Sequence, residues 1–80
     1  MIVQAPHSAD VHLNLYANSE FYPLSKIGRN EIFFRDPVTI PAGVAEVIMT
    51  VDGREHRWKV ELVHGAVPFD DAVVTRHIDE

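Results

Sequence analysis

The sequence predicts an all-β protein, a small single-domain antiparallel barrel or sandwich of about five to six strands. The first supporting observation is a pair of alternating apolar runs around Asp52-Gly53, which predicts a long central hairpin over residues 44–63. The second is a series of short strand-like segments with turn signals about every eight to twelve residues. The third is that no extended stretch carries the apolar stripe of an amphipathic helix.

The central hairpin is the best-defined element, because Asp and Gly both tolerate the positive φ angles of a two-residue type I′ turn. With these residues as the loop, Val47 lies opposite Trp58, and we expect an inner face of Val47, Met49, Val51, Trp58 and Val60. The outer face then pairs Thr50 with Glu55, Ile48 with Arg57, Glu46 with Lys59 and Val44 with Glu61. A shift of one residue would expose Trp58 and bury Arg57 and Lys59, so the pattern predicts one register.

The remaining segments are shorter. We expect strands at residues 11–16, 21–24, 31–35 and 72–78, a turn at 25–30, an extended connection at 36–43 and a loop at 64–71. Pro23 predicts that its strand lies at an edge or ends there. One of the consecutive Phe33 and Phe34 must find cover outside the core. Residues 1–10 are expected to be loosely ordered, with a possible edge strand at Ile2-Val3.

Composition limits the classes of function. Eighty residues make one domain, 1–80, and twelve acidic against seven basic side chains give a net charge of −5. The basic residues are dispersed, which argues against a nucleic-acid surface or an anionic membrane surface. There is no cysteine, no long apolar run and no basic leader before an apolar segment, so we expect a cytoplasmic protein without disulfides.

The histidines, at positions 7, 12, 56, 64 and 77, raise the alternative of a metal site. No two of them follow the spacings His-x-His or His-x-x-x-His, so we expect structural roles and no bound metal. His56 falls on the inner face of the hairpin, where we expect it to be partly covered and bonded to a backbone carbonyl.

Catalytic patterns are missing from the sequence. Asp70-Asp71, with His64 and His77, would suit acid–base chemistry, but adjacent acids in a loop with a proline usually cap a turn and face water. No serine lies in a Gly-x-Ser-x-Gly context, and the glycines are too far apart for a phosphate-binding loop. We therefore expect neither an enzyme nor a cofactor.

A protein interface is the remaining possibility. Phe33, Val44 and Ile48 are apolar residues expected on the outer surface, where a second copy or another protein would cover them. The sequence thus favours a non-enzymatic interaction or accessory domain that acts through self-association or a protein partner.

The Leu24-Ser25-Lys26-Ile27-Gly28 segment, the following strand, Ile40-Pro41-Ala42-Gly43 and the hairpin resemble, over residues 23–63, the PilZ domains. These are small β-barrels that bind cyclic dinucleotides. Ser25 and Gly28 match the family's Asp/Asn-x-Ser-x-x-Gly turn, Pro23 replaces its first residue, and the arginine-rich motif is absent. The resemblance implies, as the alternative function, a barrel that binds an anionic small ligand or nucleotide through Ser25, Lys26 and Arg29.

Overall fold

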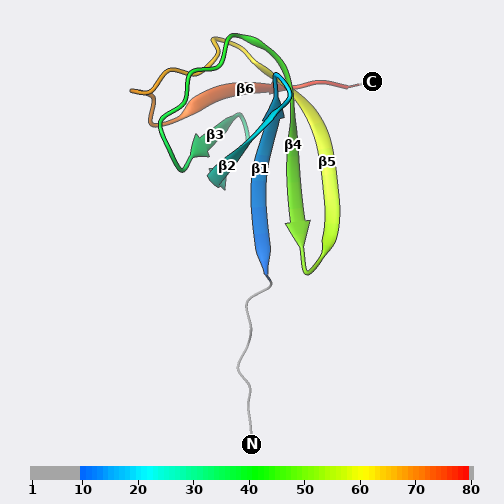
Figure 1. Cartoon of the computed structure of the whole chain (residues 1–80). Coiled ribbons are helices and arrows are strands. Elements are labelled where there is room, and N and C mark those ends of the chain that lie inside the picture. Colours follow the sequence, from blue (N-terminus) through cyan, green and yellow to red (C-terminus); the bar gives the residue numbers. More distant parts are fainter. Residues whose placement is uncertain (1–9, 80) are drawn as a thin grey trace, which may run out of the picture.

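The structure is a computed structural model that describes residues 10–79, so the predicted strand at Ile2-Val3 lies outside the described part. Antiparallel strands close into a barrel in the order β1-β2-β3-β6-β5-β4 (Figure 1). The strands are β1 (Val11–Ala17), β2 (Glu20–Ile27), β3 (Glu31–Phe34), β4 (Gly43–Val51), β5 (Arg54–Leu62) and β6 (Val73–His77). The prediction of a small all-β protein is confirmed, and the barrel replaces the sandwich alternative. The described residues form no helix long and apolar enough to cross a membrane.

The central hairpin is confirmed in every predicted pair. β4 and β5 align from Val51 opposite Arg54 to Val44 opposite Glu61, with Val47 opposite Trp58. Asp52 and Gly53 have φ angles of 49° and 84°, as a type I′ turn requires. The described interior is apolar, and Trp58 packs half-buried against it. The core consists of Leu15, Ala17, Leu24, Ile32, Ile40, Ala45, Val47, Val60, Leu62, Ala66 and Val73.

Ile48 departs from the expectation of an outward apolar residue, because it is only 5% exposed. It does lie on the outer face, but β1 flanks β4 on one side and β5 on the other, so Asn14 and Arg57 lie directly beside it. Arg57 is held over this face by ion pairs to Glu46, at 3.2 Å, and to Glu55. An apolar residue at the centre of three strands is therefore covered by the long side chains around it.

The prediction that Pro23 marks an edge or a strand end is wrong. Pro23 lies inside β2, which pairs with β1 on one side and β3 on the other. The Pro23 carbonyl accepts a hydrogen bond from the Arg35 amide at 3.1 Å, just beyond the end of β3. The proline is tolerated because its nitrogen, which has no hydrogen to donate, faces the point where β3 ends, so that no hydrogen bond of the β2–β3 pairing is lost. The predicted turn at 25–30 is shorter than expected, since Ser25 to Ile27 belong to β2, with a bulge at Ser25 between Leu24 and Lys26.

Phe33 and Phe34 lie on opposite faces of β3, as consecutive strand residues must: Phe34 faces the core and Phe33 faces outward. Phe34 packs against the core and meets the Tyr22 ring edge-on at 6.3 Å between centroids. Phe33 points outward, and the Lys26 ammonium lies 5.2 Å from its ring centroid. The cover that Phe33 needs outside the core is thus supplied by Lys26.

Candidate functional site

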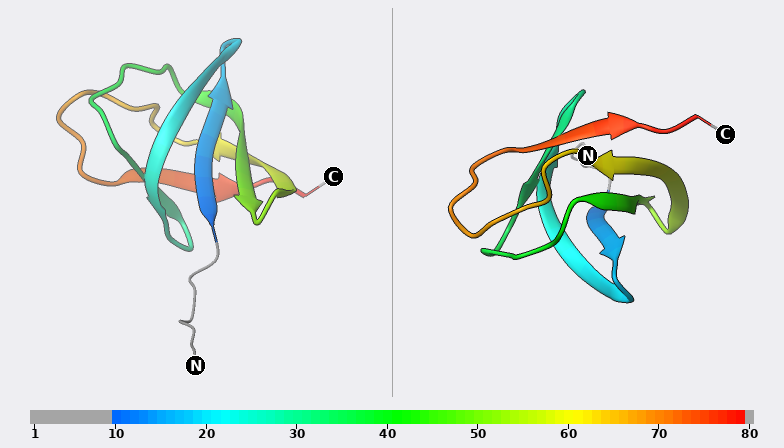
Figure 2. Two further views of the ribbon diagram at one scale, coloured as in Figure 1. Left: turned by 60° about the horizontal axis from the view of Figure 1, so that its bottom comes forward. Right: turned by 90° about the horizontal axis from the view of Figure 1, so that it is seen from above.

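Two long loops meet at one end of the barrel, which we call the loop end. They are the β3–β4 connection, residues 35–42, and the β5–β6 connection, residues 63–72 (Figure 2). Ile40 and Ala66 join them by two backbone hydrogen bonds, of 2.9 and 2.8 Å, and both residues are buried. The bridge closes the core at this end and fixes one loop against the other.

Gly65 makes this close approach possible. Its φ angle is +71°, in the left-handed region. A Cβ atom at this position would lie 2.5 Å from the Ile40 carbonyl oxygen and 2.8 Å from the Ala42 amide nitrogen. Both the backbone angle and the space therefore require glycine.

Beyond Ala66, the chain makes a tight turn from Val67 to Asp70. The Asp70 amide donates to the Val67 carbonyl at 3.0 Å, and the Val67 amide donates to Asp70 Oδ2, also at 3.0 Å. Pro68, in the second position, has a fixed φ angle. The predicted role of Asp70, an exposed acid that caps a turn, is confirmed. Two hydrogen bonds thus join the two ends of this turn and fix its backbone.

Phe69 occupies the tip of the Val67–Asp70 turn and is 90% exposed. Val67, at the start of the turn, is 47% exposed. A phenyl ring in water on a fixed turn is unusual, because most aromatic side chains in a small domain bury much of their surface. These residues present an apolar projection from the β5–β6 connection.

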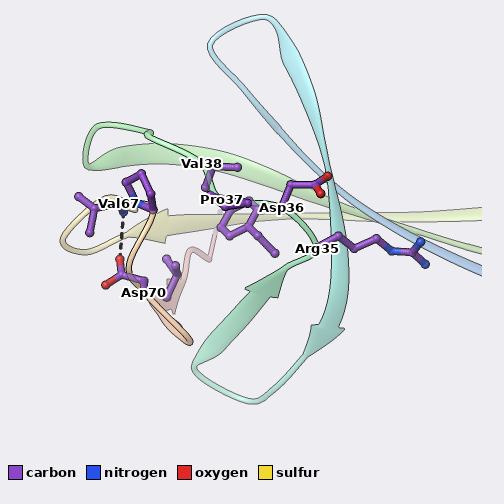
Figure 3. A pocket seen from close by; sticks show the side chains of 9 residues that line it. Arg35, Asp36, Pro37, Val38, Val67 and Asp70 are labelled. Carbon is purple, nitrogen blue, oxygen red and sulfur yellow. Dashed lines mark hydrogen bonds between the residues drawn. The ribbon is translucent and has the colours of Figure 1, made fainter.

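A cleft of about 180 Å³ lies beside this turn, between the two loops (Figure 3). It is lined by both apolar and charged residues, with the charged ones at its rim. The lining residues are Phe34, Arg35, Asp36, Pro37, Val38, Val67, Pro68, Asp70 and Val73. The side chain of Arg35 points away from the turn in Figure 3, and its Nε atom donates to the Leu24 carbonyl at 3.4 Å. Asp36 and Asp70 therefore leave the rim acidic.

The predicted ligand-binding residues lie elsewhere, on β2 and the turn that follows. The Ser25 hydroxyl donates to the Phe33 carbonyl at 3.3 Å, and the Lys26 ammonium lies over the Phe33 ring. Arg29 is exposed in the β2–β3 turn. Ser25 and Lys26 thus both interact with Phe33 of the same chain, and both side chains lie on the outer surface of the barrel.

The predicted interface residues are not brought together. Val44 is 66% exposed on β4, whereas Ile48 on the same strand is buried. Phe33 is on β3, which is separated from β4 by two strands in either direction around the barrel. No continuous patch joins the three residues.

The described histidines lie apart. His12 pairs with Asp10 at 3.3 Å, and both side chains are largely exposed. His56 is exposed rather than partly covered, because the sheet around the hairpin tip leaves the inner side open there. Within residues 10–79, no three His, Asp or Glu side chains gather as metal ligands would. His7 lies outside the described residues.

Phe69 was not among the residues that the sequence pattern selected. The strand patterns stop at Val63 and resume at Ala72, so periodicity gives no information about an aromatic residue between them. The available signal was the order Val67-Pro68-Phe69-Asp70, in which proline suits the second position of a turn and places phenylalanine in the third, at the tip.

Comparison with known proteins gives no identification: no family model, no curated protein and no solved structure matches this chain.

Proposed function

We propose that this chain is a non-enzymatic protein-interaction module that binds a partner protein through the loop end. The observation that carries the proposal is Phe69, 90% exposed at the tip of a turn whose two ends are tied by reciprocal hydrogen bonds. Aromatic anchors that enter a pocket of the partner dominate the binding energy of many interfaces. A turn whose backbone is fixed before binding also loses little backbone conformational entropy when it binds.

The surroundings of Phe69 define the kind of partner. Val67 adds apolar surface, and the adjoining cleft offers a hollow of about 180 Å³. Asp36, Asp70 and the exposed Asp71 make this end acidic. The complementary surface is an apolar pocket for the phenyl ring, flanked by lysine or arginine side chains that face these carboxylates.

The alternative function, an anionic ligand at Ser25, Lys26 and Arg29, has less support. An anion needs several donors that converge on it. The Ser25 hydroxyl is bonded to Phe33, and the Lys26 ammonium is attracted to an aromatic ring. We therefore favour the loop end over the β2 surface.

The test compares capture of proteins by the wild-type chain and by two phenylalanine variants, in extracts of the source cells. Phe69→Ala should leave the fold intact, because the ring has almost no contacts to lose. Phe21→Ala is the matched control: Phe21 is 60% exposed, but its ring lies against Tyr16 with the centroids 4.8 Å apart. Quantitative mass spectrometry then measures each captured protein.

We expect at least one protein whose capture falls about tenfold or more in Phe69→Ala and is unchanged in Phe21→Ala. Its binding should weaken as salt is raised, since the rim of the site is acidic. Equal capture by all three chains would contradict the proposal, as would a loss in both variants. Heat of binding with cyclic dinucleotides, abolished by Lys26→Ala, would favour the alternative instead.

A further inference from the structure

The barrel leaves part of β5 without a neighbour. β5 pairs with β6 only from Val60 to Leu62, and the Ile78 amide extends this pairing to the Lys59 carbonyl at 3.2 Å. Residues 54–58 have β4 on one side, and no strand among the described residues lies on the other (Figure 1). This segment, which we call the β5 edge, is at the opposite end of the strand from the loop end.

The backbone groups that the β5 edge presents can be assigned. In a hairpin with a two-residue loop, the flanking residues Val51 and Arg54 exchange hydrogen bonds, and bonded pairs then alternate along the strands. The N–H and C=O groups of Glu55 and Arg57 therefore point away from β4. The bond from the Ile78 amide to the Lys59 carbonyl fits this alternation. Groups of this kind form a template for a further strand.

We propose that the β5 edge pairs antiparallel with the β5 edge of a second copy of this chain, about a two-fold axis at His56. This inference does not depend on the proposed function of the loop end. In this register Glu55 lies opposite Arg57 of the second copy, and each pair exchanges two backbone hydrogen bonds. All the outward groups of Glu55 and Arg57 are then used. The pairing ends before Lys59, whose carbonyl is already bonded.

The side chains support this register on both faces. On the outer face, each Glu55 lies opposite an Arg57 of the other copy. The two residues already form an ion pair within each chain, and their side chains remain about half exposed, 50% and 45%, so the contact would extend this pair into a four-membered charge network. On the inner face, each Arg54 lies opposite a Trp58, so that a guanidinium can approach an indole ring. The His56 side chains face one another at the axis.

Neighbouring registers are disfavoured. A shift that centres the axis on Arg57 sets two arginines opposite each other, and one that centres it on Glu55 sets two glutamates opposite each other. Charged edge residues commonly prevent indiscriminate pairing of sheets. Here the same charges reject the shifted alignments and favour one, which is the pattern expected of a specific contact.

The C-terminal residues leave a hollow beside one end of the β5 edge. A cleft of about 350 Å³ lies where Ile78 and Asp79 leave β5, and it is lined by Glu46, Arg57, Trp58, Lys59, His77, Ile78 and Asp79. The contact involves few residues, so we expect a weak dimer, detected by sedimentation at about 0.1–1 mM protein. Because the loop end is at the other end of β5, Phe69 stays accessible in both copies.

A charge-exchange experiment tests the register on the full chain. Glu55→Arg and Arg57→Glu should each weaken self-association by about tenfold or more, because each sets like charges opposite each other in the homodimer. An equimolar mixture of the two variants should associate at least as well as the wild-type chain, since both cross-strand pairs are then of opposite charge. Glu20→Arg and Arg29→Glu, exposed and distant from β5, are matched controls that should behave like wild type.

Amide hydrogen exchange on the wild-type chain provides a second measurement that requires no variant. The Glu55 and Arg57 amides should exchange more slowly as the protein concentration rises. A wild-type chain that stays monomeric at 1 mM, single variants that associate normally, or a mixture that fails to associate would each overturn the proposal. Slow exchange at both amides that is independent of concentration would also overturn it, because the edge would then be covered within one chain. Phe69→Ala should leave all these results unchanged.

Discussion

The amide of Val67 and the carboxylate of Asp70 are joined by a 3.0 Å hydrogen bond, and the Asp70 amide returns a bond of the same length to the Val67 carbonyl. The two bonds connect the first and last residues of the turn that carries Phe69. Such capping by an aspartate side chain competes well with hydration in a short turn. The backbone conformation that places Phe69 at the tip is thus set within the chain itself.

Replacing Asp70 should loosen this turn. Asp70→Ala removes the bond to the Val67 amide, and we expect the free energy of unfolding to fall by about 0.5–1.5 kcal/mol. The amide of Phe69 should also become more mobile, as measured by NMR relaxation. Asp71→Ala is the control, because Asp71 is exposed and adjacent. Equal effects of the two substitutions would show that the side-chain bond does not hold the turn.

Gly65 should be the least replaceable glycine. Gly65→Asn should lower the stability by at least about 2 kcal/mol, because asparagine tolerates a positive φ but its Cβ would still meet the Ile40 carbonyl. Gly53→Asn is the matched control, since Gly53 also has a positive φ, of +84°, but nothing lies within 4 Å of its Cβ position. It should change the stability by less than about 0.5 kcal/mol. Urea denaturation measures both, and similar values would refute the requirement for space at Gly65.

Two aliphatic residues on the same face of β4 should differ strongly in the stability lost on truncation. Ile48→Ala should cost about 2–4 kcal/mol, because Ile48 is 5% exposed at the centre of three strands. Val44→Ala should cost less than about 0.5 kcal/mol, because Val44 is 66% exposed. Thermal or urea denaturation gives the comparison. A small effect at Ile48 would mean that its cover of long polar side chains contributes little.

Tyr22 gives a test in the alkaline range. Burial of its phenol, followed by the negative charge of Glu20 and a hydrogen bond to that side chain, raises the pKa of Tyr22 above 10.0. As the pH rises past this value the unfolded chain loses the proton first, so the contribution of Tyr22 to stability is full below pH 10 and is lost as the pH rises through the folded-state pKa.

Ultraviolet titration of the wild-type chain against Tyr22→Phe isolates this phenol. The transition that disappears in the variant should lie above pH 10, and Glu20→Gln should move it toward 10 by removing the charge. A Tyr22 transition at or below pH 10 would contradict the structure around this ring.

The hairpin could be predicted because all of its signals are local. Asp52-Gly53 fixes the turn, and the alternation on each side of it places Val47 and Trp58 on the same face. Ile48 was assigned to the surface because the hairpin alone does not show that β1 lies on its other side, more than thirty residues earlier in the chain (Ile48 pairs with Asn14). A single hairpin gives no information about the third strand beside it.

Local sequence patterns likewise could not predict how the barrel closes or that the two loops meet at the loop end. β3 pairs with β6 through Ile32 and Val73, and the loops meet through Ile40 and Ala66. These contacts join segments that are far apart in the sequence, and the pattern of one segment does not indicate which other segment it pairs with. Pro23 was misjudged for a related reason, since its effect depends on where the neighbouring strand ends.

The most direct test of the loop end as a binding surface is a photo-crosslinking phenylalanine analogue introduced at position 69 in the source cells, with position 21 as the control. We predict one discrete crosslinked protein from position 69, absent from position 21 and reduced by excess wild-type chain but not by excess Phe69→Ala. No adduct from position 69, or the same adducts from both positions, would contradict the central claim that Phe69 enters a partner protein.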